Sequence, residues 1–158
     1  MSGQNNGNVY LATEEKMREV LAGDALQNAL NLVAFLRAND FTLNANEEGE
    51  GWAVGRTVGD SVGYLLANGA EQMPGPWTLW FNTCDFADDG AADEALKQTA
   101  WAHASPCGHC HAGWQDCGGG DRVIFGREFE VLCHSPLAFT NPGGETLANM
   151  QRLMLGLR

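Results

Sequence analysis

The chain has 158 residues, a hydrophobic content of 44% and a charged content of 18%, which suits one globular domain and excludes disorder throughout. Twenty Asp and Glu residues against nine Lys and Arg residues give a formal net charge of −11. Because the basic residues are scattered along the chain, a nucleic acid or an anionic membrane surface would be repelled, and neither is expected as a partner.

The N-terminal stretch carries no export signal. Residues 1–21 lack a basic start followed by an apolar run, and no apolar run in the chain approaches the roughly 18 residues that cross a bilayer. We therefore expect a cytoplasmic protein without a membrane partner, whose thiols stay reduced. Residues 1–10 are polar and rich in Gly and Asn, which predicts a flexible start.

Two helices are predicted next. Thr13 is the expected N-cap of a helix over residues 14–21, because acidic residues follow it. Asp24 is the expected N-cap of a second helix, which ends near Asn39 and Asp40. The apolar stripe of this second helix is predicted from the spacing of Leu26, Leu30, Val33 and Leu36.

The middle of the chain has the composition of short strands. The predicted strands are residues 41–43, 52–54, 56–58, 61–68 and 77–81. Their short spacing favours an antiparallel meander, and the last strand is so apolar that burial on both faces is expected. Alternation in the fourth strand predicts Val62, Tyr64 and Leu66 on one face.

Trp77 and Trp80 cannot share one face of a regular strand. One of them could line a pocket while the other packs in the core, although structural roles for both are the simpler interpretation. Five tryptophans in a chain of this length make the question relevant to binding.

The C-terminal part returns to helical periodicity. A helix is predicted over residues 92–104, with Asp93 near its start and Ser105–Pro106 at its end. A strand is predicted at residues 137–139, after which Asn141–Pro142 opens the last helix. The stripe of that helix is predicted to be Leu147, Met150, Met154 and Leu157. Together these elements predict an α+β fold of one domain, residues 1–158, in which helices cover one face of a single antiparallel sheet.

Residues 105–133 hold four of the five cysteines, and this segment is the strongest candidate for a site. The four are Cys107, Cys110, Cys117 and Cys133. A C-x2-C turn can wrap two thiolates around one cation, and zinc prefers four tetrahedral nitrogen or sulfur ligands. We therefore predict a structural zinc site on these four cysteines, in a zinc-knuckle-like loop. Five glycines in residues 107–122 leave little apolar surface to order that loop without a metal.

Other interpretations of the same residues stay open. Cys107 and Cys110 spell the CGHC dithiol of disulfide isomerases, although the expected helix before them is not the strand that this motif needs. With His111 they also spell the C-x-x-C-H haem-attachment motif, which requires export. The cysteines could instead be small buried residues. His111 or His103 could replace a cysteine ligand or support one. Cys84 could be a core residue, a reactive thiol or a neighbour of the cluster.

Three blocks resemble a group of small bacterial proteins. The blocks are PWTLW at residues 76–80, IFGREF at 124–129 before Cys133, and FTNP at 139–142 before a helix. The resemblance extends over residues 52–158 and includes a C-x2-C pair, so it implies a metal knuckle but no particular reaction. Some of those proteins have a shorter cysteine spacing. The resemblance then implies an insertion at residues 111–116 and supports Cys117 least.

Two classes of function follow. The sequence favours a non-enzymatic, zinc-stabilised binding or regulatory module that takes a protein or small-molecule partner on its sheet face. The alternative is an enzyme, either a thiol-disulfide redox protein that uses Cys107 and Cys110 or a metal-dependent enzyme with an open zinc site. Motifs such as the Walker loop, GxGxxG, GxSxG and HExxH are absent from the sequence.

Overall fold

The computed structural model describes residues 3–46, 51–56, 61–67, 75–86, 92–106 and 120–157. These residues contain four helices: α1 (Gly3–Val20), α2 (Gly23–Ala38), α3 (Glu94–Ala102) and α4 (Gly144–Leu155). The strands in them are β1 (Thr42–Ala45), β2 (Gly51–Gly55), β3 (Gly63–Ala67), β4 (Trp77–Phe81), β5 (Ala104–Pro106), β6 (Gly120–Ile124) and β7 (Arg127–Thr140).

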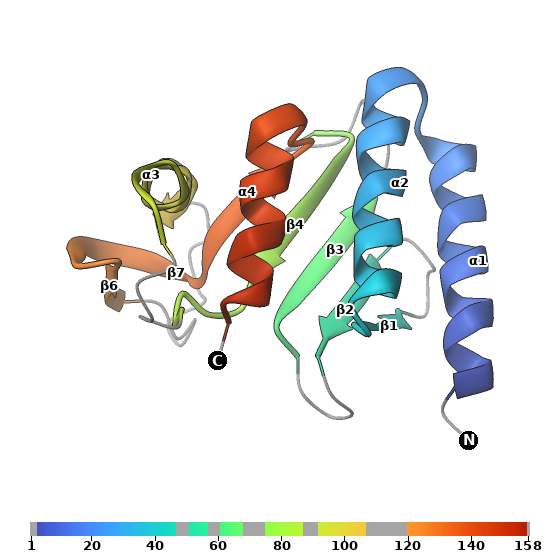
Figure 1. The fold of residues 1–158 in the computed structure, drawn as a ribbon, viewed down its shortest axis with the longest axis horizontal. Coiled ribbons are helices and arrows are strands. Elements are labelled where there is room, and N and C mark those ends of the chain that lie inside the picture. The colour runs from blue at the N-terminus through green and yellow to red at the C-terminus, as the bar shows by residue number, and fades with distance from the viewer. Residues whose placement is uncertain are drawn as a thin grey trace, which may run out of the picture.

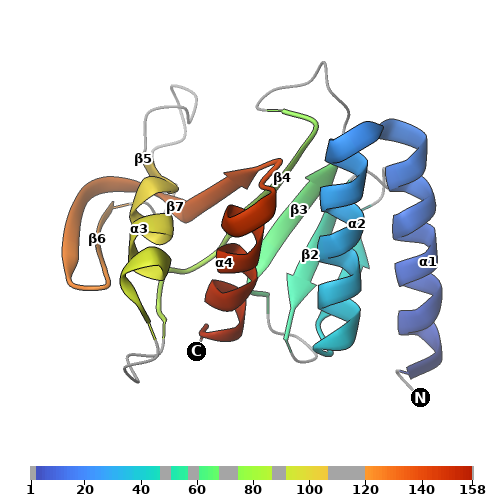
Figure 2. The ribbon, with the colours of Figure 1, turned by 45° about the horizontal axis from the view of Figure 1, so that its top comes forward.

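The described strands form one open antiparallel sheet in the order β1-β2-β3-β4-β7-β5, and β6 pairs with β7 beside this path. Strands β1 to β4 are consecutive neighbours, which confirms the predicted meander except for its strand at residues 56–58. Strand β2 ends at Gly55 and Arg56 lies in a bend, while residues 57 and 58 lie outside the described residues. All four helices lie on the same side of the sheet (Figure 1 and Figure 2). The prediction of an α+β fold with helices on one face of a single antiparallel sheet is confirmed. None of the described helices is long and apolar enough to cross a membrane.

Helix α1 begins much earlier than predicted. Thr13 is not its N-cap but a buried residue inside it, whose hydroxyl donates to the Val9 carbonyl at 2.7 Å. The prediction failed because the buried stripe of this helix already starts at Tyr10 and continues through Thr13 and Met17 at helical spacing. The flexibility predicted for residues 1–10 stays a prediction, although Tyr10 packs in the core.

Helix α2 ends at Ala38 with Asn39 as its C-cap, close to the predicted end, but its start and its buried face differ. Ala22 occupies the N-cap position, and Asp24 lies in the first turn. The fully buried residues are Ala29, Leu32, Val33 and Leu36, whereas Leu26 and Leu30 are only half-buried. The small Ala29 faces the core, so the buried stripe is rotated relative to the one drawn through the leucines.

The core lies between the helices and one face of the sheet. Cross-strand register places Trp52, Leu65, Leu79 and Phe139 in one buried row that crosses four strands. In β3 the residues on the helix side are Leu65 and Ala67, and Tyr64 and Leu66 share the opposite face, as the alternation predicts. The second face of β4 is less buried than expected. Thr78 is covered, but Trp80 is half-buried on the face without helices.

The ends of α3 and α4 test two predicted caps. Asp93 is the N-cap of α3, and its side chain accepts a hydrogen bond from the Leu96 N–H at 2.9 Å, as predicted. Helix α4 starts only at Gly144, after Gly143 at the N-cap position. Asn141 therefore does not cap this helix, and with φ at 43° it forms part of the preceding turn.

Candidate functional site

Only one of the four predicted zinc ligands, Cys133, lies in the part of the chain that the structure describes. Cys107, Cys110, Cys117 and the alternative ligand His111 lie outside the described residues. Cys133 lies in β7, where it is half-buried with its Sγ 3.7 Å from Nδ1 of His134. Within the ranges that the structure describes, no three His, Cys, Asp or Glu side chains are grouped to hold a metal. The predicted knuckle-like loop therefore remains a prediction.

The fold nevertheless brings both ends of the cysteine segment to Cys133. Pro106 at the end of β5 and Gly120 at the start of β6 both pair with Leu132 of β7. A strand residue has one neighbour on each side, so β5 and β6 lie on opposite sides of β7 at this point. Because adjacent strands are about 4.8 Å apart, the two ends of the segment 107–119 stand roughly 10 Å apart. Cys133, the residue after Leu132, lies at the same level of the sheet.

His103, an alternative ligand, is the C-cap residue of α3. Its Nδ1 lies 2.8 Å from the Thr99 carbonyl oxygen. A carbonyl can only accept, so Nδ1 is the donor of this hydrogen bond. The ring stacks on Phe139 with the centroids 4.3 Å apart. These contacts give His103 a structural role at the helix end, and a role for it at a metal stays untested.

A groove of about 410 Å³ lies on the uncovered face of the sheet, next to Cys133. We call it the sheet-face groove. It is lined by Ser61, Gly63, Tyr64, Trp80, Asn82, Cys133, His134 and Ser135. Trp80 lies directly across from Tyr64 in the register of β3 and β4. Trp77 is fully buried on the other face. The interpretation in which one tryptophan lines a pocket and the other packs in the core is therefore confirmed.

Tyr64 is held in place beside this groove. The Asn46 amide donates to its hydroxyl at 2.9 Å. A Cβ on Gly51 would lie only 1.9 Å from the same hydroxyl, so glycine at this position is what lets the ring lie across β2. The row of residues across the sheet through Tyr64 and Trp80 also contains Asn44, Ala53 and Ala138. Since none of these five residues is charged, this part of the face can take an uncharged or weakly polar surface without desolvating an ion.

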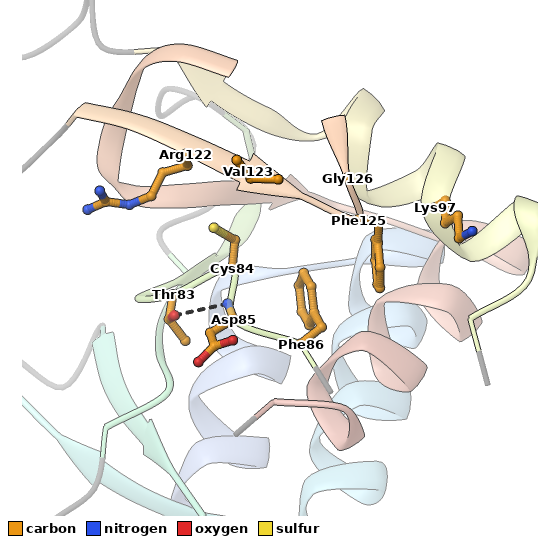
Figure 3. A pocket seen from close by; sticks show the side chains of 9 residues that line it. All are labelled: Thr83, Cys84, Asp85, Phe86, Lys97, Arg122, Val123, Phe125 and Gly126. Carbon is orange, nitrogen blue, oxygen red and sulfur yellow. Dashed lines mark hydrogen bonds between the residues drawn. The ribbon is translucent and has the colours of Figure 1, made fainter. Parts of the chain in front are cut away.

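A second and larger cavity, of about 730 Å³, lies beside Cys84 (Figure 3). We call it the Cys84 cavity. It is lined by Thr83, Cys84, Asp85, Phe86, Lys97, Arg122, Val123, Phe125 and Gly126. The lining residues come from the segment after β4, from helix α3 and from the hairpin of β6 and β7.

Direct contacts hold the walls of the Cys84 cavity together. The rings of Phe86 and Phe125 are stacked with their centroids 5.1 Å apart and an interplanar angle of 11°. Phe86 also forms a β-bridge with Leu157. From α3, the Trp101 indole N–H donates to the Ile124 carbonyl at 2.6 Å. The cavity is therefore formed by elements that are fixed to one another before any ligand enters.

The thiol of Cys84 is half-buried, and this burial is the main reason why its pKa is raised. Arg122 has a smaller, opposing effect, and Asp85 adds to the rise. A raised pKa keeps the sulfur protonated at neutral pH, whereas a nucleophilic cysteine needs the thiolate. The environment of Cys84 thus disfavours the reactive-thiol interpretation and suits a neutral lining residue.

Sequence reasoning missed the Cys84 cavity, although it considered Cys84. The nine basic residues are scattered along the sequence, but the fold places Lys97 and Arg122 in the wall of the same cavity. No local motif connects two residues that are 25 positions apart. Their proximity follows only from the tertiary packing of α3 beside the β6–β7 hairpin.

Comparisons with family models, with curated proteins and with solved structures found no match to this chain, so no relative supplies a function.

Proposed function

We propose that this protein is a zinc-stabilised binding module. In this proposal Cys107, Cys110, Cys117 and Cys133 hold one Zn²⁺, and the sheet-face groove beside Cys133 binds the partner. The observation that carries the proposal is the pairing of Pro106 and Gly120 with Leu132, which anchors both ends of the cysteine-rich segment at the level of Cys133.

Covalent reach supports this ligand set. Cys107 follows Pro106 directly, so its Cα lies about 3.8 Å from an atom whose position is fixed. Cys117 precedes Gly120 by three residues, which limits their separation to about 11 Å. Tetrahedral zinc at about 2.3 Å from each sulfur needs the sulfurs within about 4 Å of one another. These limits on chain reach allow both cysteines to approach Cys133 without a change in the sheet.

The proposed metal has a structural role. The segment between β5 and β6 contains many glycines and few aliphatic residues, so burial of its side chains offsets little of the entropy lost on ordering. Four thiolate ligands would instead order the segment and would connect β5, β6 and β7 at Leu132. Four filled positions leave no place for a substrate on the metal, which favours a binding module over a metal-dependent enzyme. The ligand set needs reduced thiols, and a cytoplasmic location provides them.

The binding part of the proposal rests on Trp80 and Tyr64. Both are aromatic side chains on the face of the sheet that the helices leave open, and Tyr64 is oriented by Asn46 and Gly51. Aromatic residues with a polar end are typical of interface centres because they contribute a large apolar area together with a hydrogen-bonding group. A partner on this groove would contact Cys133 and His134, so the zinc site would keep that edge of the groove in position.

The decisive experiment measures metal content in two matched variants. Cys133→Ser removes one proposed ligand, whereas Cys84→Ser removes the cysteine in the other cavity. We expect about one zinc per chain in the native protein and in Cys84→Ser, but far less in Cys133→Ser. Chelation of the native protein should lower its melting temperature and make four further thiols accessible to a thiol reagent.

Three outcomes would contradict the proposal. The first is metal-free native protein with the same melting temperature before and after chelation. The second is equal zinc content in Cys133→Ser and the native protein. The third is a pair of thiols that oxidises readily and reversibly in the metal-loaded protein, which would favour the redox function of Cys107 and Cys110.

A further inference from the structure

The Cys84 cavity has a charge that is unusual for this protein. Two of its lining residues, Lys97 and Arg122, are cationic and one, Asp85, is anionic, while the whole chain carries a net charge of −11. In Figure 3 the carboxylate of Asp85 lies on the side of Thr83 and points away from Phe125 and Lys97. The formal charge of this lining is therefore +1, which favours an anion over a cation as the ligand.

Most other basic side chains in the described ranges already have partners. Lys16, Arg18, Arg37 and Arg152 form ion pairs with carboxylates. Arg56 donates to the carbonyls of the residues near the end of α4, and Arg127 lies over two aromatic rings. Lys97 is half-buried and forms no ion pair with a carboxylate of the described ranges. Figure 3 shows its side chain at one end of the cavity.

The rest of the wall is apolar. Val123 is 58% exposed, which is unusual for a valine in a β-strand, and its side chain lines the cavity. Beside it lie the stacked rings of Phe86 and Phe125 and the protonated thiol of Cys84. Figure 3 shows Arg122 and Lys97 at opposite ends of the cavity with these side chains between them. A ligand that reaches Lys97 must therefore lie along an apolar wall.

We propose that the Cys84 cavity binds a small organic acid, whose carboxylate pairs with Lys97 and whose apolar body lies against Phe125, Phe86 and Val123. Arg122 at the far end adds long-range attraction for the negative charge. The cavity volume of about 730 Å³ lies within the range of small-molecule sites, roughly 300 to 1,000 Å³. None of the lining residues is a proposed zinc ligand, and the inference does not depend on the proposed function.

The chemistry of the lining argues against three other classes of ligand. A cationic ligand would meet both Lys97 and Arg122, and a neutral polar ligand would leave the ammonium group of Lys97 without a partner. A highly charged anion such as a polyphosphate would gain nothing from the apolar wall. An acid with a single charge and an apolar body matches both parts of the cavity.

The test uses 8-anilinonaphthalene-1-sulfonate, an apolar sulfonate, as a fluorescent reporter on the full-length protein as purified. Three competitors of the same shape then displace it: 3-phenylpropionate, 3-phenylpropanamide and 3-phenylpropylamine. We expect the carboxylate to displace the reporter at a concentration about tenfold lower than the amide, because a charge-assisted pair is worth more than about 1.4 kcal/mol. The amine should not displace it.

Matched variants locate the site. Lys97→Gln should weaken 3-phenylpropionate about tenfold, whereas Lys16→Gln, the same change on another helix, should leave binding unchanged. Val123→Ser should weaken the acid severalfold. Val131→Ser is its control, since Val131 belongs to the same hairpin, is 55% exposed and does not line the cavity.

The zinc content of each variant is measured in parallel, so loss of the acid site and loss of the metal are distinguishable. Binding that lacks saturation, equal displacement by the acid and the amide, or equal effects of Lys97→Gln and Lys16→Gln would each overturn the proposal.

Discussion

Tyr10 connects the first helix to the point where the chain enters the sheet. Its ring is 4% exposed, and its hydroxyl donates to the carbonyl oxygen of Phe41, directly before β1. Burial raises the pKa of this hydroxyl, Arg37 opposes the rise, and Asp40 adds a smaller increase. The folded protein therefore holds Tyr10 in its neutral form more strongly than the unfolded chain does.

Tyr10→Phe should lower the free energy of unfolding at pH 7 by about 1 kcal/mol, because the Phe41 carbonyl loses its donor. The variant should also lose the part of the pH dependence of the free energy of unfolding that Tyr10 causes. Since the folded pKa lies above the unfolded value near 10.0, the contribution of Tyr10 is complete below that pH and is lost as pH rises through the folded pKa. Urea unfolding between pH 8 and pH 11 measures both effects.

Tyr64→Phe is the control, since this hydroxyl accepts from Asn46 at the sheet-face groove and does not connect α1 to the sheet. An alkaline loss of stability that is equally steep in Tyr10→Phe and in the native protein would show that other groups cause it.

Individual residues were predictable where local chemistry decides their role. Asp93 caps α3 because its carboxylate reaches the Leu96 N–H three residues further along the chain. This local interaction is predictable from the sequence. Thr13 has the same preference for a cap, but burial against the core and a hydrogen bond to Val9 keep it inside α1. The tertiary packing around Thr13 determines its place inside α1, and this packing cannot be read from a single sequence.

Among the elements, β7 has the most unusual geometry. It bends at Val131, whose φ of 53° is a left-handed conformation that a β-branched residue rarely adopts. The carboxylate of Asp121 accepts a hydrogen bond from the Val131 N–H at 3.0 Å, and the register between β6 and β7 shifts at this point. The bend directs the first part of β7 toward β6 and the second part into the main sheet, so that Leu132 can meet both β5 and β6.

Val131→Asn should therefore stabilise the protein by up to about 1 kcal/mol, because asparagine tolerates the left-handed conformation better than valine does. The side chain of Val131 is exposed, and the bond to Asp121 uses the backbone N–H, so little else is lost. Thermal and urea unfolding measure the change.

The matched control for the bend is Val123→Asn, at an equally exposed valine of the same hairpin that does not have a positive φ. We expect no gain there. If both variants changed stability alike, strain at Val131 would not be the cause.

The order of the four helices and of β1 to β4 was readable from the sequence, whereas β5, β6, residues 127–136 of β7 and the pairing of distant strands were not. Short apolar runs separated by turns gave the meander of β1 to β4, because such neighbours pair locally. The place of β7 between β4 and β5, with β6 beside it, depends on the bend at Val131, a conformation that valine disfavours and that sequence patterns do not signal. The same bend brings Pro106 and Gly120 to Leu132. For this reason the sequence could identify the cysteines but not what anchors their segment.

At the scale of the whole molecule, acidic charge is in excess and ion pairs are few. The four salt bridges in the described ranges involve side chains that stay in contact with solvent, and such pairs contribute little to stability. Eleven excess negative charges on a chain of 158 residues repel one another over distances that salt controls. Repulsion should therefore outweigh the attraction in these pairs.

The resulting prediction is that salt stabilises this protein. At pH 7, raising NaCl from 10 mM to 0.5 M shortens the Debye length from about 30 Å to only a few ångströms, and the free energy of unfolding should rise as self-repulsion is screened. Near pH 4.5, the isoelectric point of the sequence, the net charge is close to zero and the salt effect should vanish. Urea unfolding at constant zinc content measures both conditions. Stability that falls with salt at pH 7 would mean that the few ion pairs dominate the electrostatics of the fold.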